Sequence, residues 1–417
     1  MRIKELLVEN FRGIRRMELE LHPKLNVFIG VNGSGKSSVL DIIAMLFSRS
    51  PIFSDGNSIP ITAQDISKKA DTISAELFCV ADLEYSMQLS YSKTSQSSHC
   101  LPLHGNGSLE NLRRDIQDGL GDCCFPLVVY YPANRAVLDI PERIRGFRST
   151  VNPLNALDGA LTNSLDYHLF FGRLRESEHS VLKKTDLLSK MDTDPFLKWY
   201  ILQIDTIKNA LNNVFSEQFS SLQIQPQTFN FTIAKHGDLL TFSQFSDGEK
   251  GLIALVGDLA QRLAIANPPL ENPLEGEGIV LIDEIDLHLH PQWQRMILPK
   301  LTETFPNCQF IVSTHSPQVL GEIRSENVFI LIDGETGIEY HRPSYEIFGQ
   351  TSDILLEDMM QTSDRNIAVQ KDVEQILLAI ERGNPDDAKI LYQKLKERAK
   401  DISECSLIDL RLGTRRE

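Results

Sequence analysis

Short hydrophobic runs bounded by turn residues recur along the chain. Residues 25–29 precede a glycine-rich loop, residues 125–131 precede a proline, residues 278–282 precede two carboxylates, and a run beginning at residue 308 leads to a histidine. Such runs, about four to eight residues long, are typical of strands buried on both faces of a sheet. Ligands of parallel sheets bind beyond the carboxyl ends of the strands, so these strand ends are where we expect a site.

Alternation of apolar and polar residues predicts further strands outside this core. Residues 3–8 and 17–21 alternate on either side of a turn at residues 10–14 and predict a hairpin that leads into the first buried strand. Residues 72–81 and 85–91 lie in a region rich in Ser, Asp and Thr, and predict a β subdomain beside the core.

Helical periodicity follows the glycine-rich loop at residues 38–46, occupies much of residues 154–219 and returns at residues 251–263. The middle segment predicts an inserted helical arm or lid. A helical tail is predicted at residues 368–400, broken at Gly383-Asn384-Pro385, which would cap the domain or dock a partner. The predicted seam of this helical hairpin consists of Ile376, Leu377, Ile380, Ile390, Leu391 and Leu395.

The composition is that of an ordinary globular protein. The 417 residues are 41% hydrophobic, enough to bury a core, and 42 basic against 57 acidic residues give a formal net charge of −15. This acidity argues against nonspecific coating of nucleic acid, while a local basic patch stays compatible with it. The six cysteines form no C-x-x-C pair, so neither a zinc site nor a disulfide framework is indicated. Without a signal peptide or an apolar run of about 20 residues, we expect a cytoplasmic protein.

The strongest chemical signal is Gly30-Val31-Asn32-Gly33-Ser34-Gly35-Lys36-Ser37, which matches the phosphate-loop pattern G-x-x-x-x-G-K-[ST] between a predicted strand and a predicted helix. Its glycines let backbone N–H groups surround phosphate oxygens, and the helix N-terminus adds partial positive charge. Lys36 would contact the β- and γ-phosphates of ATP, and Ser37 would ligate Mg²⁺. The predicted ATP-binding residues are Gly30, Asn32, Gly33, Ser34, Gly35, Lys36, Ser37 and Ser38.

Two carboxylates and a histidine at strand ends are candidate hydrolytic groups. Asp283 directly follows the strand at residues 278–282 and is the predicted Mg²⁺ ligand, usually through water. Glu284 is the predicted catalytic base that polarises the attacking water. His315 is predicted to reach the γ-phosphate, where it would orient water or sense phosphate. The alternatives are a plain acidic pair and a hydrogen-bonded histidine at the ends of strands.

A second phosphate-binding candidate is Ser246-Asp247-Gly248-Glu249. It follows a hairpin predicted at residues 229–233 and 239–242 and opens the helix predicted at residues 251–263. A serine hydroxyl and a glycine amide at a helix N-terminus are able to bind phosphate. Taken alone, the four residues are also a good helix cap.

Several weaker candidates have structural alternatives. Phe11 and Arg12, in the first turn, are candidates for the edge of the nucleotide, against a purely structural role. Gln64 is a candidate metal-sensing glutamine, against an exposed loop residue. Arg135 follows a buried strand, where it would approach phosphate or an adjoining subunit, against a plain surface arginine.

Two further motifs resemble metal sites. Asp286 is a weaker site candidate that precedes His288-Leu289-His290, where packing and subunit contact are favoured because no third ligand lies at the usual spacing. Asp192-Thr193-Asp194 has the D-x-D form of a metal nuclease but lies in a charged connection without a preceding buried strand. We therefore interpret it as solvated.

Taken together, Asn10-Phe11-Arg12-Gly13, the phosphate loop, Ser246-Asp247-Gly248-Glu249, Ile282-Asp283-Glu284 and Ser313-Thr314-His315 resemble, in type and order, the ABC-type ATPase heads of the SMC, RecF and OLD families. The resemblance implies a head-to-tail homodimer or higher homo-oligomer that sandwiches ATP. It implies that the phosphate loop, the acidic pair and the histidine act in cis, and that the signature at residues 246–249 acts in trans. This signature departs from the family's Ser-Gly-Gly-Gln.

More narrowly, residues 128–135, 245–252 and 256–260 and the Ala388-Lys389 tail look like those of the PtuA family, the ATPases of Septu-type antiphage systems, including retron-associated ones. The resemblance implies a sensor subunit that binds and hydrolyses ATP slowly, is not itself a nuclease, and controls a separate PtuB-like HNH nuclease through head engagement. DNA contact would be direct or through the partner. The alternative is a RecF- or SMC-like DNA-repair ATPase that binds DNA without a nuclease partner.

The predicted fold is therefore α/β, a P-loop NTPase of the ABC-ATPase head type. It has a mixed β-sheet core, a β subdomain, an inserted helical arm and a C-terminal helical tail. The predicted parts are an N-terminal ATPase lobe with the phosphate loop and β subdomain at 1–150, the arm at 151–220, a C-terminal ATPase lobe with the signature, acidic pair and histidine at 221–345, and the tail at 346–417.

Overall fold

The computed structural model describes residues 1–50, 53, 58–68, 70–80, 84–92, 95–103, 124–133, 152–161, 195–215, 219–225, 230–235, 238–335, 337–360, 367–399 and 404–412. The chain divides into two compact units, Met1–Gln350 and Thr351–Glu417. Arg135 and Asp192-Thr193-Asp194 lie outside the described residues, so the interpretations given for them stay predictions.

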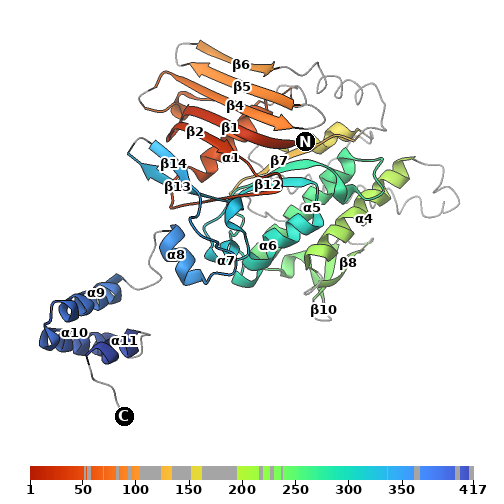
Figure 1. The fold of residues 1–417 in the computed structure, drawn as a ribbon. Helices are drawn as coiled ribbons and strands as arrows, with labels where there is room; N and C mark the ends of the chain where they lie inside the picture. The colour runs from red at the N-terminus through yellow and green to blue at the C-terminus, as the bar shows by residue number, and fades with distance from the viewer. Residues whose placement is uncertain are drawn as a thin grey trace. The chain divides into compact units, whose positions relative to one another are not determined.

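A six-stranded mixed sheet forms the centre of the first unit (Figure 1). Its order is β14-β13-β3-β12-β11-β7, with β13 and β14 antiparallel and every other pair parallel. Strands β7, β11 and β12 are buried at every position, as their uninterrupted hydrophobic runs predict. The strands are β3 (Leu25–Ile29), β7 (Leu127–Tyr131), β11 (Gly278–Ile282), β12 (Cys308–Ser313), β13 (Val328–Gly334) and β14 (Gly337–His341).

A five-stranded antiparallel sheet in the order β2-β1-β4-β5-β6 confirms the predicted hairpin and β subdomain. Helix α1 (Lys36–Phe47) packs against strands of both sheets (Figure 1), so one hydrophobic cluster joins them. The helix ends at Phe47, one residue beyond the predicted limit, and Ser48 is its C-cap. The strands are β1 (Arg2–Phe11), β2 (Ile14–Glu20), β4 (Thr72–Val80), β5 (Glu84–Ser92) and β6 (Ser95–Leu103).

Further helices cover the other face of the six-stranded sheet (Figure 1). Helix α5 contacts β7 and is buried along most of its length, and α4 packs along α5. Helix α4 confirms the helical pattern in part of the predicted arm. These elements are α4 (Pro195–Phe215), α5 (Asp247–Ala266), α6 (Pro291–Thr304) and α7 (Pro317–Leu320), with a small sheet of β8 (Phe219–Gln225), β9 (Asn230–Lys235) and β10 (Asp238–Thr241).

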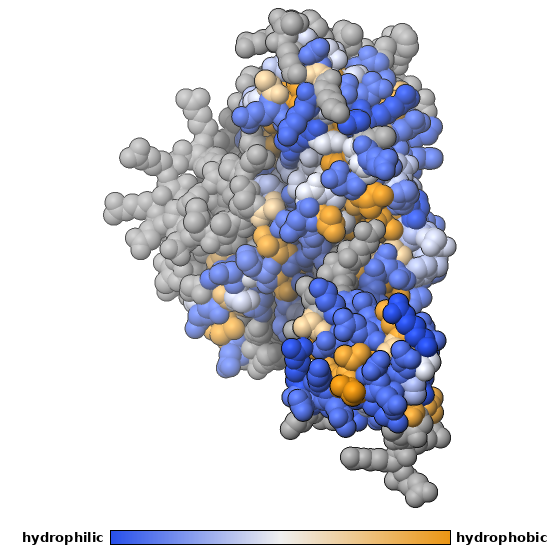
Figure 2. Space-filling model, turned by 90° about the vertical axis from the view of Figure 1, so that its left-hand side faces the viewer, coloured by the Kyte–Doolittle hydropathy of each residue, from blue (hydrophilic) through white to orange (hydrophobic). Residues whose placement is uncertain are grey.

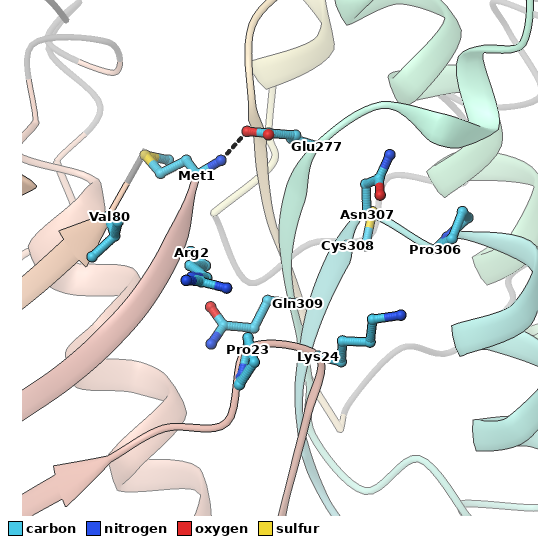
Figure 3. A pocket seen from close by; sticks show the side chains of 10 residues that line it. All are labelled: Met1, Arg2, Pro23, Lys24, Val80, Glu277, Pro306, Asn307, Cys308 and Gln309. Carbon is cyan, nitrogen blue, oxygen red and sulfur yellow. Dashed lines mark hydrogen bonds and ion pairs between the residues drawn. The ribbon is translucent and has the colours of Figure 1, made fainter. Parts of the chain in front are cut away.

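A cavity of about 370 Å³ lies where the two sheets meet, at the amino ends of the parallel strands (Figure 3). Its lining includes Lys24, just before β3, and Cys308, at the start of β12. Gln309 crosses between the sheets there, because its side chain accepts the Ile3 N–H at 2.6 Å and donates to the Ile3 carbonyl at 2.8 Å. The Glu277 carboxylate pairs with the Met1 amino group (Figure 3). The cavity is thus at the sheet edge opposite to the carboxyl ends of these strands.

The second unit contains α8 (Ser352–Met360), α9 (Ile367–Glu381), α10 (Pro385–Arg398) and α11 (Glu404–Arg411). Helices α9 and α10 form the predicted hairpin, with Gly383 at φ 74° between them. Five of the six predicted seam residues lie in or against its core, but Ile390 was wrongly assigned, since 54% of it is exposed. Ala388 and Tyr392 take inward positions of α10 together with Leu395, and Ile390 lies outside this buried face.

Exposed apolar side chains are scattered over the described surface. Figure 2 shows the apolar areas of one face separated by hydrophilic ones, an arrangement that is normal for globular proteins. Within the described ranges, every helix is too short or too polar to span a lipid bilayer.

Candidate nucleotide-binding site

The phosphate loop leaves the carboxyl end of β3 and enters α1 through three glycines with positive φ, namely Gly30 (149°), Gly33 (84°) and Gly35 (91°). At Gly30 a Cβ atom would lie 2.3 Å from the Leu331 carbonyl oxygen, so both the conformation and the space require glycine. Gly35 is the N-cap of α1 and has no side chain to cap the helix. The first amides of this helix therefore stay available to an anion.

Lys36 is buried and its ammonium faces the loop. Its Nζ donates to the Gly30 carbonyl at 2.9 Å and to the Val31 carbonyl at 3.0 Å. Burial lowers the pKa of Lys36, and the charges of Asp283, Glu284 and Asp286 act against that shift. The lysine and the acidic strand end, predicted separately from two distant motifs, thus belong to one electrostatic neighbourhood.

Ser34 provides a test of whether the loop fits a phosphate group. Its side chain is 1% exposed, and within the described part of the chain its hydroxyl has no hydrogen-bond partner. A buried hydroxyl left unsatisfied costs about 1–3 kcal/mol. A phosphate oxygen accepts hydrogen bonds and would remove this cost, so the loop fits a nucleotide. Asn32 and Ser37 are exposed and Ser38 is partly exposed.

The acidic pair stands at the carboxyl end of β11, between β7 and β12. The Asp283 N–H donates to the Tyr131 carbonyl at 2.8 Å. The Ser313 hydroxyl donates to Asp283 Oδ1 at 2.5 Å and accepts the Glu284 N–H at 2.7 Å. Ser313 therefore orients both acidic residues, a role that sequence reasoning missed because it depends on β12 lying directly beside β11.

Glu284 adopts φ 48°, in the left-handed region that residues other than glycine seldom occupy. Such a conformation costs about 1–3 kcal/mol and is concentrated at functional sites, where the surrounding structure holds it. Here the Glu284 N–H bond to Ser313 and the Ile285 N–H bond to the Ser313 carbonyl at 3.0 Å supply that support. The turn fixes the backbone of the predicted base.

Asp286 holds the end of β12, where the predicted switch histidine follows. Its Oδ1 accepts the Thr314 hydroxyl at 2.5 Å and the His315 N–H at 3.2 Å. Burial lowers the pKa of His315, and the Lys36 charge lowers it further against the three nearby carboxylates. This lowered pKa favours the neutral imidazole, the form that accepts a proton or orients water. Among the described residues, no group of three or more His, Cys, Asp or Glu is arranged to hold a metal alone.

The signature residues begin α5. Ser246 is its N-cap, and the Glu249 carboxylate accepts the Ser246 N–H at 3.0 Å and the Ser246 hydroxyl at 2.9 Å. This capping box ties the serine to Glu249. Asp247 is exposed and pairs with Lys250 at 3.4 Å. A Cβ at Gly248 would lie 2.1 Å from the His288 carbonyl oxygen, so α5 touches the backbone that follows the acidic pair.

The weaker candidates lie beside this site. Phe11 is fully buried, and the Arg12 guanidinium lies 4.9 Å from the centre of its ring. Arg12 pairs with Asp41 of α1 at 2.5 Å and with Asp65 at 3.0 Å. Gln64 is exposed in the short turn that ends at Asp65. Arg12 thereby joins this turn to the phosphate-loop helix, and nucleotide contact by Phe11, Arg12 or Gln64 stays a prediction.

Two protein-family models match the chain. One, described as "AAA ATPase domain", matches residues 1–102, and the other, described as "AAA domain, putative AbiEii toxin, Type IV TA system", matches residues 138–321. Between them the two matches contain the phosphate loop, the signature and the acidic pair.

Several curated relatives align over most of the chain, among them a retron protein and a Septu protein. "Retron Vc95 probable ATPase" of Vibrio cholerae serotype O1 biovar El Tor is 30% identical over 442 residues, which cover 93% of this chain and 85% of the relative. "Septu protein PtuA" of Bacillus thuringiensis is 25% identical over 372 residues, which cover 86% of this chain and 84% of the relative.

A solved SMC head, in a complex with the C-terminal winged helix domain of ScpA, aligns with a TM-score of 0.50. The alignment covers 82% of this chain and 98% of the SMC head, at 15% identity. At this identity the likeness shows the fold alone, and it confirms the predicted P-loop ATPase head.

Proposed function

Since the chain belongs to the family of retron and Septu ATPases, we propose that it is the subunit of an antiphage defence complex that binds and hydrolyses ATP. The observation that carries the proposal is the shared electrostatic neighbourhood of Lys36, the acidic pair and His315, assembled at the carboxyl ends of three adjacent strands. A purely structural phosphate loop would not need a catalytic base and a neutral imidazole beside it.

Each group has a chemical role in this proposal. The loop amides, Lys36 and the Ser34 hydroxyl bind the phosphates of ATP. Asp283 and Ser37 would hold Mg²⁺, which would supply positive charge beside the phosphates of ATP. Glu284, held in its turn by Ser313, polarises the attacking water, and neutral His315 orients it beside the γ-phosphate.

The proposal includes a second copy of the chain. Ser246 and Asp247 are exposed at the N-terminus of a 20-residue helix, where a partner's phosphate would be bound by amides and the helix dipole. The ABC-type head resemblance supports closure of two heads over ATP, with the signature acting in trans. Binding of ATP would then set the closed state, and slow hydrolysis would release it.

We further propose that the closed state controls a separate HNH nuclease, and that this chain performs no nucleic-acid cleavage itself. The support is the relationship to Septu PtuA and retron ATPases, which are components of multi-gene systems by the family resemblance. Contact with DNA would be made by this chain or by the nuclease. The proposed location of the complex is the cytoplasm.

The test is affinity purification of the tagged chain from cells that carry its neighbouring genes. Mass spectrometry would identify partners, and DNA cleavage by the purified assembly would be followed with and without ATP. Lys36→Ala serves as the variant that loses ATP, because it removes the phosphate-binding cation together with its hydrogen bonds to the loop carbonyls. We expect a copurifying HNH protein whose cleavage responds to ATP in the wild type and does not respond in Lys36→Ala.

A different result would support another function. If the chain purifies alone, cleaves nothing and hydrolyses ATP faster when DNA is added, it is a DNA-repair ATPase of the RecF or SMC kind. If Lys36→Ala and wild type bind ATP equally, the assignment of the phosphate loop is wrong.

A further inference from the structure

Two tyrosines at the end of β7 point to opposite faces of the central sheet. Consecutive side chains of a strand alternate in direction. The Tyr130 hydroxyl donates to Asp41 Oδ1 on α1 at 2.8 Å, whereas the Tyr131 hydroxyl donates to Asp258 Oδ2 on α5 at 2.9 Å. One strand thus contacts the phosphate-loop helix on one face and the signature helix on the other.

The contact with α5 continues as a buried ion pair. Arg262 Nε donates to Asp258 Oδ2 at 2.7 Å, and the two side chains are only 6% and 3% exposed. Burial lowers the pKa of Arg262, but Asp258, Tyr131 and Asp158 together outweigh burial and keep that pKa above its ordinary value. Asp258 Oδ2 therefore accepts hydrogen bonds from both the Arg262 guanidinium and the Tyr131 hydroxyl, and hydrogen bonds with a charged partner are stronger than those between neutral groups.

The ion pair also contacts residues at the start of the predicted arm. Arg262 Nη1 donates to the Ala156 carbonyl at 2.6 Å and to the Asp158 carbonyl at 3.0 Å. The same segment pins β7, since the Tyr130 N–H donates to the Ala160 carbonyl at 2.7 Å. Residues 152–161, β7 and α5 are thus held at a single point.

This point adjoins the hydrolytic site. The Tyr131 carbonyl accepts the Asp283 N–H at 2.8 Å, so the residue that holds α5 through its hydroxyl holds the acidic strand end through its backbone. Tyr131 and Asp258 lie in two of the sequence stretches, 128–135 and 256–260, that resemble the PtuA family. The proposed function gives these stretches no role.

We propose that Tyr131, Asp258 and Arg262 are positioning residues that fix the signature helix relative to the chain's own nucleotide site. The proposal rests on the proposed closure of two heads over ATP. In a head-to-tail dimer, the phosphate-loop site and the signature of one chain must both contact the partner chain at the same time. The angle between α5 and the central sheet therefore decides whether both contacts can form. Loss of the Tyr131 hydroxyl removes a hydrogen bond that fixes this angle and leaves the phosphate loop unchanged.

The test uses tyrosine-to-phenylalanine changes, which remove one hydroxyl and create no cavity. Glu284→Gln would be the parent, because a variant without the base is expected to accumulate ATP-bound dimers. Tyr131→Phe and the matched control Tyr130→Phe would each be added to it. The measurements are ADP affinity, which does not require closure, and the dimer fraction at saturating ATP by light scattering.

We expect Tyr131→Phe and Tyr130→Phe to have opposite effects on ADP affinity and dimerisation. A lost hydrogen bond to a carboxylate corresponds to about a tenfold effect. Tyr131→Phe should leave ADP affinity within about twofold of the parent and weaken dimerisation at saturating ATP about tenfold. Tyr130→Phe should weaken ADP binding and leave dimerisation at saturating ATP unchanged. A merely structural role would lower both readouts together or neither.

The outcomes separate the two proposals. If the Glu284→Gln parent stays monomeric in ATP, head closure is wrong and the positioning role is wrong with it. If the parent dimerises and Tyr131→Phe dimerises equally well, only the positioning role is overturned. Arg262→Lys is a second variant, since it keeps the positive charge but lacks the second nitrogen that reaches Ala156 and Asp158. It should reproduce the pattern of Tyr131→Phe, and a parent-like result would also overturn the positioning role.

Discussion

Two glycines of one helix should respond to alanine with opposite signs. Gly248 and Gly251 lie in the first turns of α5, three residues apart. A Cβ atom at Gly248 would lie 2.1 Å from the His288 carbonyl oxygen and 2.9 Å from the His288 carbonyl carbon. A Cβ atom at Gly251 would meet nothing within 4 Å. The atoms opposing Gly248 are backbone atoms, which cannot rotate away.

The magnitudes follow from this difference. Alanine is favoured over glycine within a helix by about 0.5–1 kcal/mol, and Gly251→Ala should stabilise by that amount. Gly248→Ala gains the same term but must displace backbone, and overpacking costs about 1–3 kcal/mol. The variants should therefore differ by about 1–3 kcal/mol, with Gly248→Ala the less stable. In a unit of this size, 1 kcal/mol corresponds to a shift of roughly 1–2 °C in the unfolding midpoint.

The assay is thermal unfolding of wild type and both single variants without nucleotide, followed by tryptophan fluorescence. The midpoint should rise slightly in Gly251→Ala and fall in Gly248→Ala. His288 itself has φ 60°, so a displaced loop would also disturb the turn after Glu284, and ATP turnover should fall in Gly248→Ala. Equal midpoints for the two variants would refute the close packing of α5 on this loop.

Two further predictions concern pH and the buried ion pair. The pKa of His315 is lowered from 6.5, so the folded protein binds fewer protons than the unfolded chain as the pH falls below this value. Turnover and stability should therefore be maintained at pH 7–8 and decline below about pH 6.5. His315→Gln should remove this acid dependence of kcat, and an unchanged profile would exclude His315 as its source. Asp258→Asn leaves Arg262 buried without its partner and should cost about 3–5 kcal/mol of unfolding free energy, whereas Asp247→Asn, at an exposed pair, should cost less than about 1 kcal/mol. Similar losses measured by chemical denaturation would contradict the buried pair.

Local motifs predicted much of the fold because their own residues determine their conformation. The phosphate loop requires positive φ at Gly30 and Gly35, and the helix after it follows within two residues of the predicted start. Strand order is different, since it depends on which hydrophobic runs pair. The sequence contains no local signal that β12 lies between β3 and β11, or that β14 extends the sheet. The error at Ile390 also arises because the local pattern does not decide packing: α10 contains many polar residues, and its apolar residues are compatible with either of two buried faces.

The same limit applies to the candidate site. Lys36, Asp283, Glu284 and His315 were found from motif and strand end, and the structure brings them together. Ser313 was named only as part of the motif that ends in His315, and its role was not predicted, because a serine in a hydrophobic strand acquires this role only from the neighbouring strand. Asp286 was found as a weak candidate, and its contacts with Thr314 and His315 could not be read from a separation of 28 residues.

The signature carboxylate leads to a last prediction. Glu249 accepts two hydrogen bonds from Ser246, so its negative charge lies at the helix end that would meet a partner's phosphate. Two unit charges about 4 Å apart repel by about 1 kcal/mol even in water. Glutamine keeps the capping box, because its amide oxygen also accepts the Ser246 N–H. Glu249→Gln should therefore change unfolding free energy by less than about 0.5 kcal/mol.

Glu249→Gln should change dimer formation more than the free energy of unfolding, because each closed dimer contains two contacts between a signature and a partner's phosphate. In the Glu284→Gln background, Glu249→Gln should dimerise at about a tenfold lower protein concentration in saturating ATP, and this advantage should shrink as salt is raised. Sedimentation velocity across a salt series measures both effects. Weaker dimers in Glu249→Gln would mean that the carboxylate contributes to closure itself. The departure from Ser-Gly-Gly-Gln would then be part of the site, whereas tighter dimers would make it a restraint on closure by ATP.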